Sequence, residues 1–388
     1  MTIGIDIRHL ARGPSTGIAE VTCELIEVLA RLAPEDRIRV FYTGRRIPPT
    51  RVLSWPDTFV NLTLTRWRMP NRLFDFAARG LRFPKLDLVL GSVDIFLSPH
   101  ALVAPLRASR RVVVVHDLSF VAHPEFFSPA SRRWHRLMDI RQQAREAARL
   151  VVPSQATARD LTRFWHVPKE RIRVIPWGTD FSPKGASESI PDFKFPGRSG
   201  QVPTSNFALY LGAVEARKNV VGIVRALALL AREPAFRNFR LVIAGPEGWK
   251  GTEVVREAQM LGIGSSVVFL GYVSEGEKQA LYRRASLFVY PSFYEGFGLP
   301  VLEAMAAGVP VVTSAISSLP EVAGDAALLV DPRQPEDIAI AMREILNDRI
   351  LADTLAARGR ARAAQFTWEK TGQAVLETLR DVAANPHP

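Results

Sequence analysis

Short apolar segments and amphipathic segments alternate along most of the chain. The first apolar segment, residues 3–7, predicts a β-strand, and the apolar positions from Ile18 to Leu32 recur at helical spacing. Further strands are predicted at residues 37–42, 60–64, 95–97, 111–115, 150–153 and 171–175. A polar helix is expected at about 129–148, and Ser154 is expected to cap a helix that ends near Trp165. Strands that alternate with helices predict a parallel, doubly wound α/β sheet.

The alternation is interrupted over residues 181–205, where Ser, Pro, Gly and Lys dominate and no periodicity is present. It resumes with predicted strands at 207–211, 240–244, 267–270, 287–290, 309–313 and 327–330. Helices are predicted at 220–231, 275–284, 335–346, 350–365 and 367–383. A chain of 388 residues also exceeds the roughly 250–300 residues that one hydrophobic core usually supports. We therefore expect two Rossmann-like domains, residues 1–180 and 206–366, joined by a linker at 181–205 and followed by a final segment, 367–388.

The net charge of +11 arises entirely in the first half of the chain. Residues 1–180 hold 28 Lys and Arg against 17 Asp and Glu, whereas the remaining residues hold 22 of each. Cations alternate with aromatic residues over 66–74, and the stretch 128–149 carries Arg132, Arg133, Arg136, Arg141, Arg145 and Arg149. Such a surface favours an anionic membrane or a lipid-pyrophosphate partner, with a solvated face as the alternative. Nucleic acid is not expected as a partner, because no nucleic-acid-binding motif accompanies the charge.

The expected compartment is the cytoplasm, with the protein peripheral on the inner face of the membrane. The single cysteine, Cys23, cannot form an intrachain disulfide, which suits the cytosol. The first eight residues contain an acid and resemble a strand rather than a signal peptide. No window offers about 18 unbroken apolar residues, as a membrane-spanning helix requires.

Two carboxylates, Glu295 and Glu303, stand eight residues apart around a glycine-rich turn. Gly296 and Gly298 let the backbone approach a ligand closely, because they have no Cβ atom. The apolar run from Leu299 onward predicts a helix, and a helix N-terminus favours a phosphate group. The carboxylates are expected to bind hydroxyl groups instead. A sugar joined to a nucleotide diphosphate carries both kinds of group.

A second candidate site feature is the cation pair Arg217–Lys218, which follows a predicted strand. Two cations held there would stabilise the negative charge that develops on a departing nucleoside diphosphate. His116 also follows a predicted strand, as do Gly245 and Glu295. Because ligands of parallel sheets bind beyond the carboxyl ends of the strands, these residues are expected to face one crevice.

The segment from Glu295 to Val312 resembles the E-x7-E region of retaining glycosyltransferase family 4. Further segments resemble that family in the same order along the chain: 113–117, 175–180, 211–219 and 244–246. The resemblance implies the GT-B fold, in which two Rossmann-like domains face each other across a cleft and the C-terminal helix packs back on the N-terminal domain. It implies acceptor binding by the first domain and donor binding by the second.

The resemblance also implies roles for single residues. Glu303 would accept hydrogen bonds from the ribose, Glu295 from the transferred sugar, and His116 would contact the donor sugar. The implied catalytic residues are His116, Glu295, Arg217 and Lys218. The implied substrate-binding residues are Gly17, Gly245, Tyr272, Gly296, Phe297, Gly298, Leu299 and Glu303. Relatives often have two glycines near Gly17 where this chain has one.

No metal or other cofactor is expected, because the sequence contains neither an Asp-x-Asp pair nor a His/Cys cluster with metal-ligand spacing. The basic pair and helix amides would take the place of Mg²⁺. In the family the anomeric configuration is retained by same-face attack, and the leaving phosphate oxygen takes the acceptor proton. No enzymic nucleophile is needed.

The segments 116–120 and 123–127 most resemble mannosyltransferases of polysaccharide and O-antigen assembly. The leading prediction is therefore transfer of mannose from GDP-mannose to a saccharide, lipid-linked acceptor, with UDP-sugars left open. One alternative is a UDP-sugar 2-epimerase of the same architecture. Another is a non-enzymatic basic binding module. A glycosidase that uses Glu295 and Glu303 as its carboxylate pair fits poorly, because both carboxylates already have a role in the phosphate-type loop.

Overall fold

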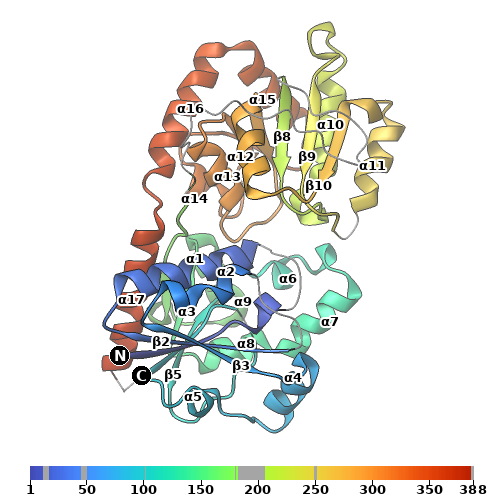
Figure 1. Cartoon of the computed structure of the whole chain (residues 1–388). Coiled ribbons are helices and arrows are strands. Elements are labelled where there is room, and N and C mark those ends of the chain that lie inside the picture. The colour runs from blue at the N-terminus through green and yellow to red at the C-terminus, as the bar shows by residue number, and fades with distance from the viewer. Residues whose placement is uncertain are drawn as a thin grey trace. The chain divides into compact units, whose positions relative to one another are not determined.

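The computed structural model describes residues 1–11, 17–44, 50–100, 102–179, 181, 206–248 and 251–385, so the predicted linker lies outside the described residues except for Phe181. The chain forms two compact units, each with its own parallel sheet (Figure 1). Unit 1 comprises Met1–Ala122, Pro129–Gly178 and Thr367–Pro388. Unit 2 comprises His123–Ser128 and Thr179–Phe366.

Unit 1 is built on a seven-stranded sheet with the order β3-β2-β1-β4-β5-β6-β7. The strands are β1 Thr2–Asp6, β2 Arg37–Thr43, β3 Leu62–Trp67, β4 Ile95–Ser98, β5 Arg110–Val114, β6 Arg149–Val152 and β7 Ile172–Val174. All neighbours run parallel, and Ile3 of β1 pairs with Ile38 on one side and Ile95 on the other. This order, which reverses direction between β1 and β4, is that of a doubly wound Rossmann-like sheet and confirms the predicted fold class.

The helices of unit 1 cover both faces of this sheet, as a parallel sheet requires. They are α1 Gly17–Leu32, α2 Thr50–Leu53, α3 Trp55–Thr58, α4 Asn71–Gly80, α5 Leu86–Val89, α6 Ser119–Ala122, α7 Pro129–Met138, α8 Ile140–Glu146, α9 Gln155–Trp165 and α17 Trp368–Ala384. As predicted, Ser154 caps α9, since its side chain accepts a hydrogen bond from the Thr157 amide at 3.1 Å. None of the helices in the described ranges is both long enough and apolar enough to span a bilayer.

The prediction of one helix over residues 129–148 is wrong. Asp139 adopts a left-handed conformation (φ 44°) and separates α7 from α8. Its carboxylate accepts a hydrogen bond from the Gln142 amide at 3.3 Å and so starts the second helix. Arg149, which the sequence placed with the helical arginines, is the first residue of β6 instead.

The C-terminal helix α17 packs on α1, as predicted. Gly372 of α17 lies against Val28 of α1, where an added Cβ would approach the valine to 2.6 Å. The start of α17 is held by residues 176–178, which are distant from it in the sequence. Thr371 donates a hydrogen bond to the Pro176 carbonyl at 2.7 Å. A Cβ at Gly178 would lie 2.1 Å from the Trp368 amide nitrogen, so only glycine allows this approach.

Unit 2 contains a six-stranded parallel sheet with the order β10-β9-β8-β11-β12-β13. Its strands are β8 Phe207–Leu211, β9 Arg240–Ala244, β10 Val267–Gly271, β11 Leu287–Tyr290, β12 Val311–Ser314 and β13 Leu328–Val330. Its helices are α10 Val220–Leu230, α11 Gly251–Met260, α12 Glu275–Arg284, α13 Leu299–Ala306, α14 Leu319–Ala323, α15 Pro335–Asn347 and α16 Arg349–Ala363. The central strands β8 and β11 are buried along almost their whole length, which explains their continuous apolar sequences.

Candidate functional site

The loops that follow β8, β9 and β10 lie side by side at the carboxyl edge of the unit 2 sheet. The Gly212 amide donates to the Ala244 carbonyl at 2.8 Å, and the Gly245 amide donates to the Gly271 carbonyl at 2.7 Å. Gly245 has φ +144°, and a Cβ there would lie only 2.0 Å from the Gly212 carbonyl oxygen. Glycine is therefore required at 245 for the loops to meet. Tyr272, directly after β10, lies at the same edge and is 62% exposed.

Three of the predicted catalytic residues form one charged cluster at this edge. Arg217 and Lys218 lie in a 3-10 turn, η4 (Ala216–Lys218), which follows β8, and Glu295 follows β11. Glu295 Oε2 accepts a hydrogen bond from Arg217 Nη1 at 3.0 Å, and Glu295 Oε1 lies 2.7 Å from Lys218 Nζ. The backbone joins the same elements, because the Phe293 amide donates to the Arg217 carbonyl at 2.8 Å. Residues 78 positions apart thus share one hydrogen-bond network.

The charged groups of the cluster shift the pKa values of one another. Burial opposes ionisation of the Glu295 carboxyl, but Arg217 and Lys218 outweigh burial and hold the pKa of Glu295 at about 2. Burial lowers the pKa of Lys218, against the attraction of Glu295. Tyr290, a residue that sequence reasoning missed, accepts a hydrogen bond from Lys218 and donates to Glu295 Oε1 at 3.0 Å. Glu215 also pairs with Arg217, with Oε2 3.1 Å from Nε. Two cations and two carboxylates therefore share the cluster, and an entering anion would compete with both carboxylates for the cations.

Glu303 lies in the first turns of α13 and has a separate set of partners. Its Oε1 atom accepts a hydrogen bond from Lys278 Nζ at 2.9 Å, and its Oε2 atom accepts one from the Tyr282 hydroxyl at 3.1 Å. Both partners come from α12, four residues apart on one helix face. Sequence reasoning missed them, although this spacing on a correctly predicted helix was a usable signal.

The glycine-rich turn before α13 is tied down by two serines that the sequence analysis also missed. Ser318, which is fully buried, donates to the carbonyls of Glu295 and Phe297 at 2.9 and 2.8 Å. Ser317 donates to the Glu295 carbonyl at 2.6 Å. Gly298 caps α13 with φ +116° and provides no side-chain cap, so the helix begins without a side-chain acceptor at its N-terminus.

The other predicted binding residues around this turn differ in how far they are buried. The Phe297 ring is buried and packs edge-on against Phe366, with 6.0 Å between ring centroids. Any contact of Phe297 with a ligand would therefore involve its backbone. Gly296 is buried beside it, and Leu299, the first residue of α13, is half-buried.

The short segment His123–Ser128 belongs to unit 2 and packs on the loop that precedes Glu295. The Phe126 ring stacks on the Phe293 ring, with 5.7 Å between ring centroids. The His123 ring packs edge-on against the Tyr294 ring, with 5.6 Å between centroids. Phe293 is the residue whose amide binds the Arg217 carbonyl. These aromatic contacts therefore support the loop that carries Glu295.

His116 lies in unit 1, two residues beyond β5. Its Nε2 atom lies 2.8 Å from the Pro99 carbonyl oxygen, which can only accept, so Nε2 carries the proton. Burial lowers the pKa of His116, so its imidazole is neutral at pH 7. The ring of His116 lies beside that of His100, with 6.3 Å between ring centroids, and the ring of His100 lies beside that of His9, with 5.1 Å between centroids. His9 and His100 follow β1 and β4, the neighbouring strands, and were not singled out from the sequence.

Gly17 is the exposed first residue of α1, and the residues before it, 12–16, lie outside the described part of the chain. Within the described ranges no three His, Cys, Asp or Glu side chains are grouped so that they could hold a metal ion.

The low pKa of Glu295 predicts acid-sensitive stability for unit 2. The folded-state pKa of about 2 lies below the ordinary value of 4.5, so the stabilisation is present above pH 4.5 and is lost as pH falls toward 2. By the size of the shift it amounts to at most about 3 kcal/mol. Urea unfolding between pH 7 and pH 3 should show a steeper loss of unfolding free energy for the wild type than for Glu295→Gln, which cannot ionise. Parallel pH profiles for the two proteins would contradict this.

Two family models match the chain, one in each half. Residues 15–182 match the model described as Glycosyltransferase Family 4, and residues 193–362 match the model described as Glycosyl transferases group 1. The chain is 35% identical over 363 residues to O-antigen chain mannosyltransferase B of Escherichia coli, with 92% of this chain and 93% of that protein covered.

Solved structures show the same architecture at lower identity. Sucrose-phosphate synthase from Thermosynechococcus elongatus superposes with a TM-score of 0.76 at 21% identity, covering 99% of each chain. Anabaena HepE in complex with UDP and glucose superposes with a TM-score of 0.72 at 18% identity, covering 98% of this chain and 100% of that one. These similarities establish the fold, and the sequence relationship establishes the class of enzyme ahead of the epimerase and binding-module alternatives. The chain therefore belongs to glycosyltransferase family 4, a family of retaining glycosyltransferases, and has the GT-B fold.

Proposed function

We propose that this glycosyltransferase moves mannose from GDP-mannose to a saccharide on a lipid-linked acceptor, in O-antigen-type polysaccharide assembly. The observation that carries the proposal is the cluster in which Arg217, Lys218 and Glu295 share hydrogen bonds at the carboxyl edge of the unit 2 sheet. Paired cations suit a diphosphate, and carboxylates suit sugar hydroxyls. The mannosyltransferase relative supports mannose as the sugar.

In this proposal each part of the site takes one part of the donor. Arg217 and Lys218 bind the diphosphate, together with the amides before α13. Glu303 accepts hydrogen bonds from the ribose hydroxyls on its remaining lone pairs, beside those that it receives from Lys278 and Tyr282, which hold the carboxylate in place. Glu295 accepts hydrogen bonds from the mannose hydroxyls. Gly245 and Tyr272 line the same edge of the sheet.

The transfer step follows from this arrangement. The bond between the anomeric carbon and the diphosphate oxygen breaks, and a bond from the acceptor oxygen forms on the same face of the sugar. The acceptor proton passes to the leaving phosphate oxygen, so the products are the α-mannoside and GDP. Arg217 and Lys218 stabilise the developing charge, which is the work a metal ion does in other transferases. His116, neutral and hydrogen-bonded to Pro99, orients the donor sugar.

Calorimetry of GDP and UDP is the direct test of the donor. We expect GDP to bind at least about tenfold more tightly, because hydrogen bonds to the base discriminate strongly. With GDP-mannose and a lipid-linked saccharide, NMR of the product should show the α-anomer. Tighter UDP binding would overturn the donor assignment. Release of a free epimerised UDP-sugar without acceptor would overturn transferase activity as the main reaction.

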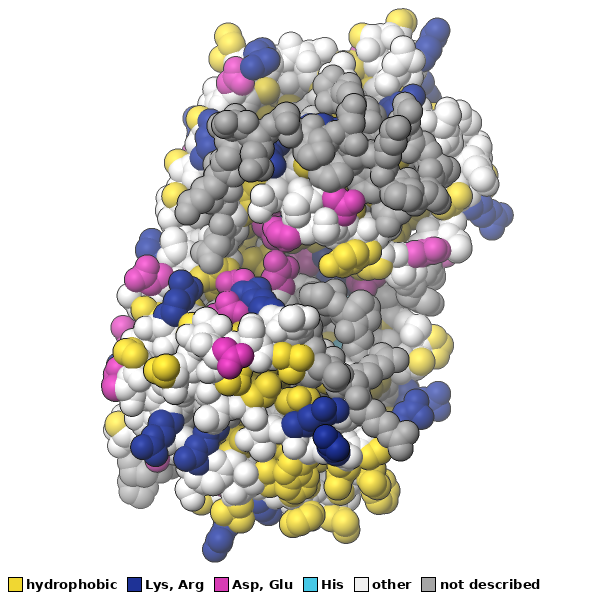
Figure 2. Space-filling view, viewed as in Figure 1, with side chains coloured by type: hydrophobic (Ala, Val, Ile, Leu, Met, Phe, Trp, Pro, Cys, Tyr) yellow, Lys and Arg dark blue, Asp and Glu magenta, His cyan; other side chains and the backbone are white. Residues whose placement is uncertain are grey.

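We further propose that unit 1 docks on the cytoplasmic face of an anionic membrane. Of the two stretches that the sequence indicated, only parts are exposed: Phe74 is buried, and Arg149 pairs with Asp381 at 2.8 Å. Five exposed apolar side chains of unit 1 lie on α4, on the turn after it and on α5: Leu73, Phe76, Leu81, Phe83 and Leu88. Arg72, Arg79 and Arg82 are exposed among them. Figure 2 shows hydrophobic side chains gathered over this end of unit 1 beside Lys and Arg.

The two exposed phenylalanines provide a test of membrane contact. Phe76 is 70% exposed and Phe83 is 61% exposed, so Phe76→Ser with Phe83→Ser should fold normally. We expect cosedimentation with phosphatidylglycerol vesicles to weaken by about tenfold or more, since each ring loses its transfer into the bilayer. Reversing the charges of Arg132, Arg133 and Arg136 should add a salt-dependent loss. Met260→Ser, at an equally exposed site on unit 2, is the control, and equal losses in both proteins would contradict the assignment.

A further inference from the structure

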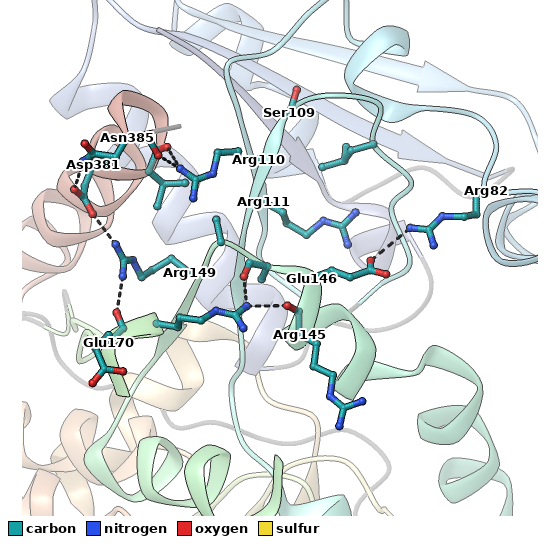
Figure 3. Close-up of a pocket in the computed structure, with 15 residues that line it drawn as sticks. Arg82, Ser109, Arg110, Arg111, Arg145, Glu146, Arg149, Glu170, Asp381 and Asn385 are labelled. Atoms are coloured by element: carbon teal, nitrogen blue, oxygen red, sulfur yellow. Dashed lines mark hydrogen bonds and ion pairs between the residues drawn. The ribbon is translucent and has the colours of Figure 1, made fainter. Parts of the chain in front are cut away.

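Unit 1 contains a hollow of about 660 Å³ at the amino ends of β5, β6 and β7. Figure 3 shows Arg110, Arg111 and Arg149 on neighbouring strands, with Asp381 of α17 and Asn385, the residue after α17, on one side and Arg82 on the other. Ligands of parallel sheets normally bind at the opposite, carboxyl edge. His116 lies beyond that edge of β5, and a strand of this length spans about 17 Å. The hollow is therefore separate from the histidines at the carboxyl edge.

The hollow has a surplus of positive charge. Six arginines line it together with three carboxylates, Glu146, Glu170 and Asp381. The arginines are Arg82, Arg110, Arg111, Arg145, Arg149 and Arg171. Within the described part of the chain, two ion pairs join these groups: Arg149–Asp381 at 2.8 Å and the exposed Arg82–Glu146 pair at 3.6 Å. An excess of three positive charges therefore faces a single concave surface.

Two of the half-buried arginines, Arg110 and Arg171, are held by neutral groups. Arg110 donates to the Val382 carbonyl at 2.9 Å and to Asn385 at the end of α17. Arg171 donates to the carbonyls of Ala144 and Arg145, both at 2.9 Å, at the end of α8. Backbone carbonyls orient a guanidinium group without cancelling its charge. These contacts hold the cations in place and leave their charge available to a ligand.

Two donors in the hollow also lack an acceptor. The Nε atoms of Arg111 and Arg149 are buried and have no hydrogen-bond partner among the described residues. Buried polar groups are normally hydrogen-bonded, so each such atom indicates a missing partner. The charges also disfavour one another: burial, followed by the charge of Arg149, lowers the pKa of Arg171. Burial, partly offset by Glu146, lowers the pKa of Arg111 to about 10. Both arginines nevertheless stay charged at pH 7.

We propose that this hollow is a binding site for a phosphate or pyrophosphate group. Guanidinium groups match phosphate oxygens in charge and in planar, bidentate geometry. Capping of α8 and α17 accounts for Arg171 and Arg110, but it does not account for Arg111, whose terminal nitrogen bonds the Ala104 carbonyl in a loop. A phosphate would supply the acceptors that Arg111 and Arg149 lack and would neutralise the surplus charge.

The phosphate group has two possible sources with the same chemistry. Arg82 lines the hollow, and its chain neighbours Leu81 and Phe83 are exposed apolar residues. A lipid headgroup could therefore occupy the hollow while its chains lie on this apolar surface. A soluble phosphate ester would use the hollow alone.

Calorimetry with inorganic pyrophosphate at constant ionic strength tests the site. The wild type should show two binding events per chain, one in this hollow and one at Arg217 and Lys218. Arg217→Gln should remove the second event and keep the first. Arg111→Gln should weaken the first by about tenfold or more and keep the second, as expected for loss of a charge-assisted hydrogen bond. Because the second event reports an intact unit 2 and circular dichroism reports folding, a misfolded variant is recognised.

Arg82→Gln guards against a structural effect of the Arg111 variant. The Arg82 side chain is 68% exposed, so its loss should leave the fold unchanged while weakening the first event severalfold. Arg349→Gln, 87% exposed on unit 2, removes the same charge elsewhere and should change neither event. The absence of any event that persists in Arg217→Gln, or a first event that survives both Arg111→Gln and Arg82→Gln, would overturn the proposal.

Vesicles distinguish the two sources. If the ligand is a lipid headgroup, pyrophosphate should displace the wild type from phosphatidic acid vesicles, and Arg111→Gln should already bind them more weakly. If the ligand is a soluble phosphate ester, vesicle binding should be equal in the two proteins and insensitive to pyrophosphate, while the calorimetric event remains.

Discussion

Glu295→Gln is expected to lower the turnover number by about 10²–10³-fold, the range observed when one precisely placed electrostatic group is removed from a catalytic site. Glutamine has the size of glutamate but no charge. It would therefore remove the ion pairs that Glu295 now makes with Arg217 and Lys218, at 3.0 and 2.7 Å, and would weaken the acceptor that holds the sugar hydroxyls. Because Glu295 is assigned to the sugar rather than the nucleotide, GDP affinity should be maintained.

The measurement is steady-state kinetics with GDP-mannose together with calorimetry of GDP. Glu257→Gln is the matched control, since Glu257 pairs with Arg225 at 2.7 Å on the surface of the same unit and has no assigned role. The control should leave the turnover number unchanged. A Glu295→Gln enzyme with normal turnover would exclude the role given to this carboxylate, and a large loss of GDP affinity would move its role to the nucleotide.

Lys218→Met is expected to lower the turnover number by a similar factor of about 10²–10³. Lys218 is buried, touches the Tyr290 hydroxyl and is one of the two cations proposed to stabilise the leaving diphosphate. Charge builds up on that group in the transition state, so the loss should fall mainly on kcat. The variant also leaves Glu295 with Arg217 as its remaining cation, so thermal unfolding must be measured alongside activity.

Lys278→Met is the informative comparison for Lys218→Met. Lys278 is another buried lysine of unit 2 and binds the second motif carboxylate, Glu303, at 2.9 Å. Since Glu303 is assigned to the ribose, loss of Lys278 should raise KM for the donor more than it lowers kcat. If the two lysine variants change kcat and KM in the same proportions, the division of the site into a leaving-group part and a ribose part is wrong.

Elements with strong local signals were predicted closely. The helix predicted at 275–284 matches α12, because Ser274 and Glu277 form a capping box that marks its start in the sequence itself. The strand predicted at 287–290 matches β11, a continuous apolar run. By contrast α4 was missed, because only Phe74 and Ala78 are buried while Leu73 and Phe76 are exposed, which obscures the helical period.

The candidate site shows the same division. Glu295, Glu303, Arg217 and Lys218 could be found from the sequence, because spacing and neighbouring glycines mark them locally. Tyr290 and Ser318 could not, since each acts through a partner that only folding brings near. Lys278 was missed too, although its spacing from Tyr282 on a predicted helix was a local signal. The assignment of His123–Ser128 to unit 2 is also a tertiary result, because it depends on Phe126 stacking on Phe293.

The sequence by itself determined the two parallel sheets, most of their helices and the identity of the charged residues at the strand ends. Hydrophobic period, caps and glycine turns act over a few residues, and so they are visible in a linear pattern. Only the tertiary structure decided which charges pair and which stay uncompensated. Arg217 pairs with Glu295, which is 78 residues away in the sequence, whereas Arg110 and Arg171 donate their hydrogen bonds to backbone carbonyls. The partner of a side chain depends on how distant loops and helix ends pack, and this is not visible in the sequence.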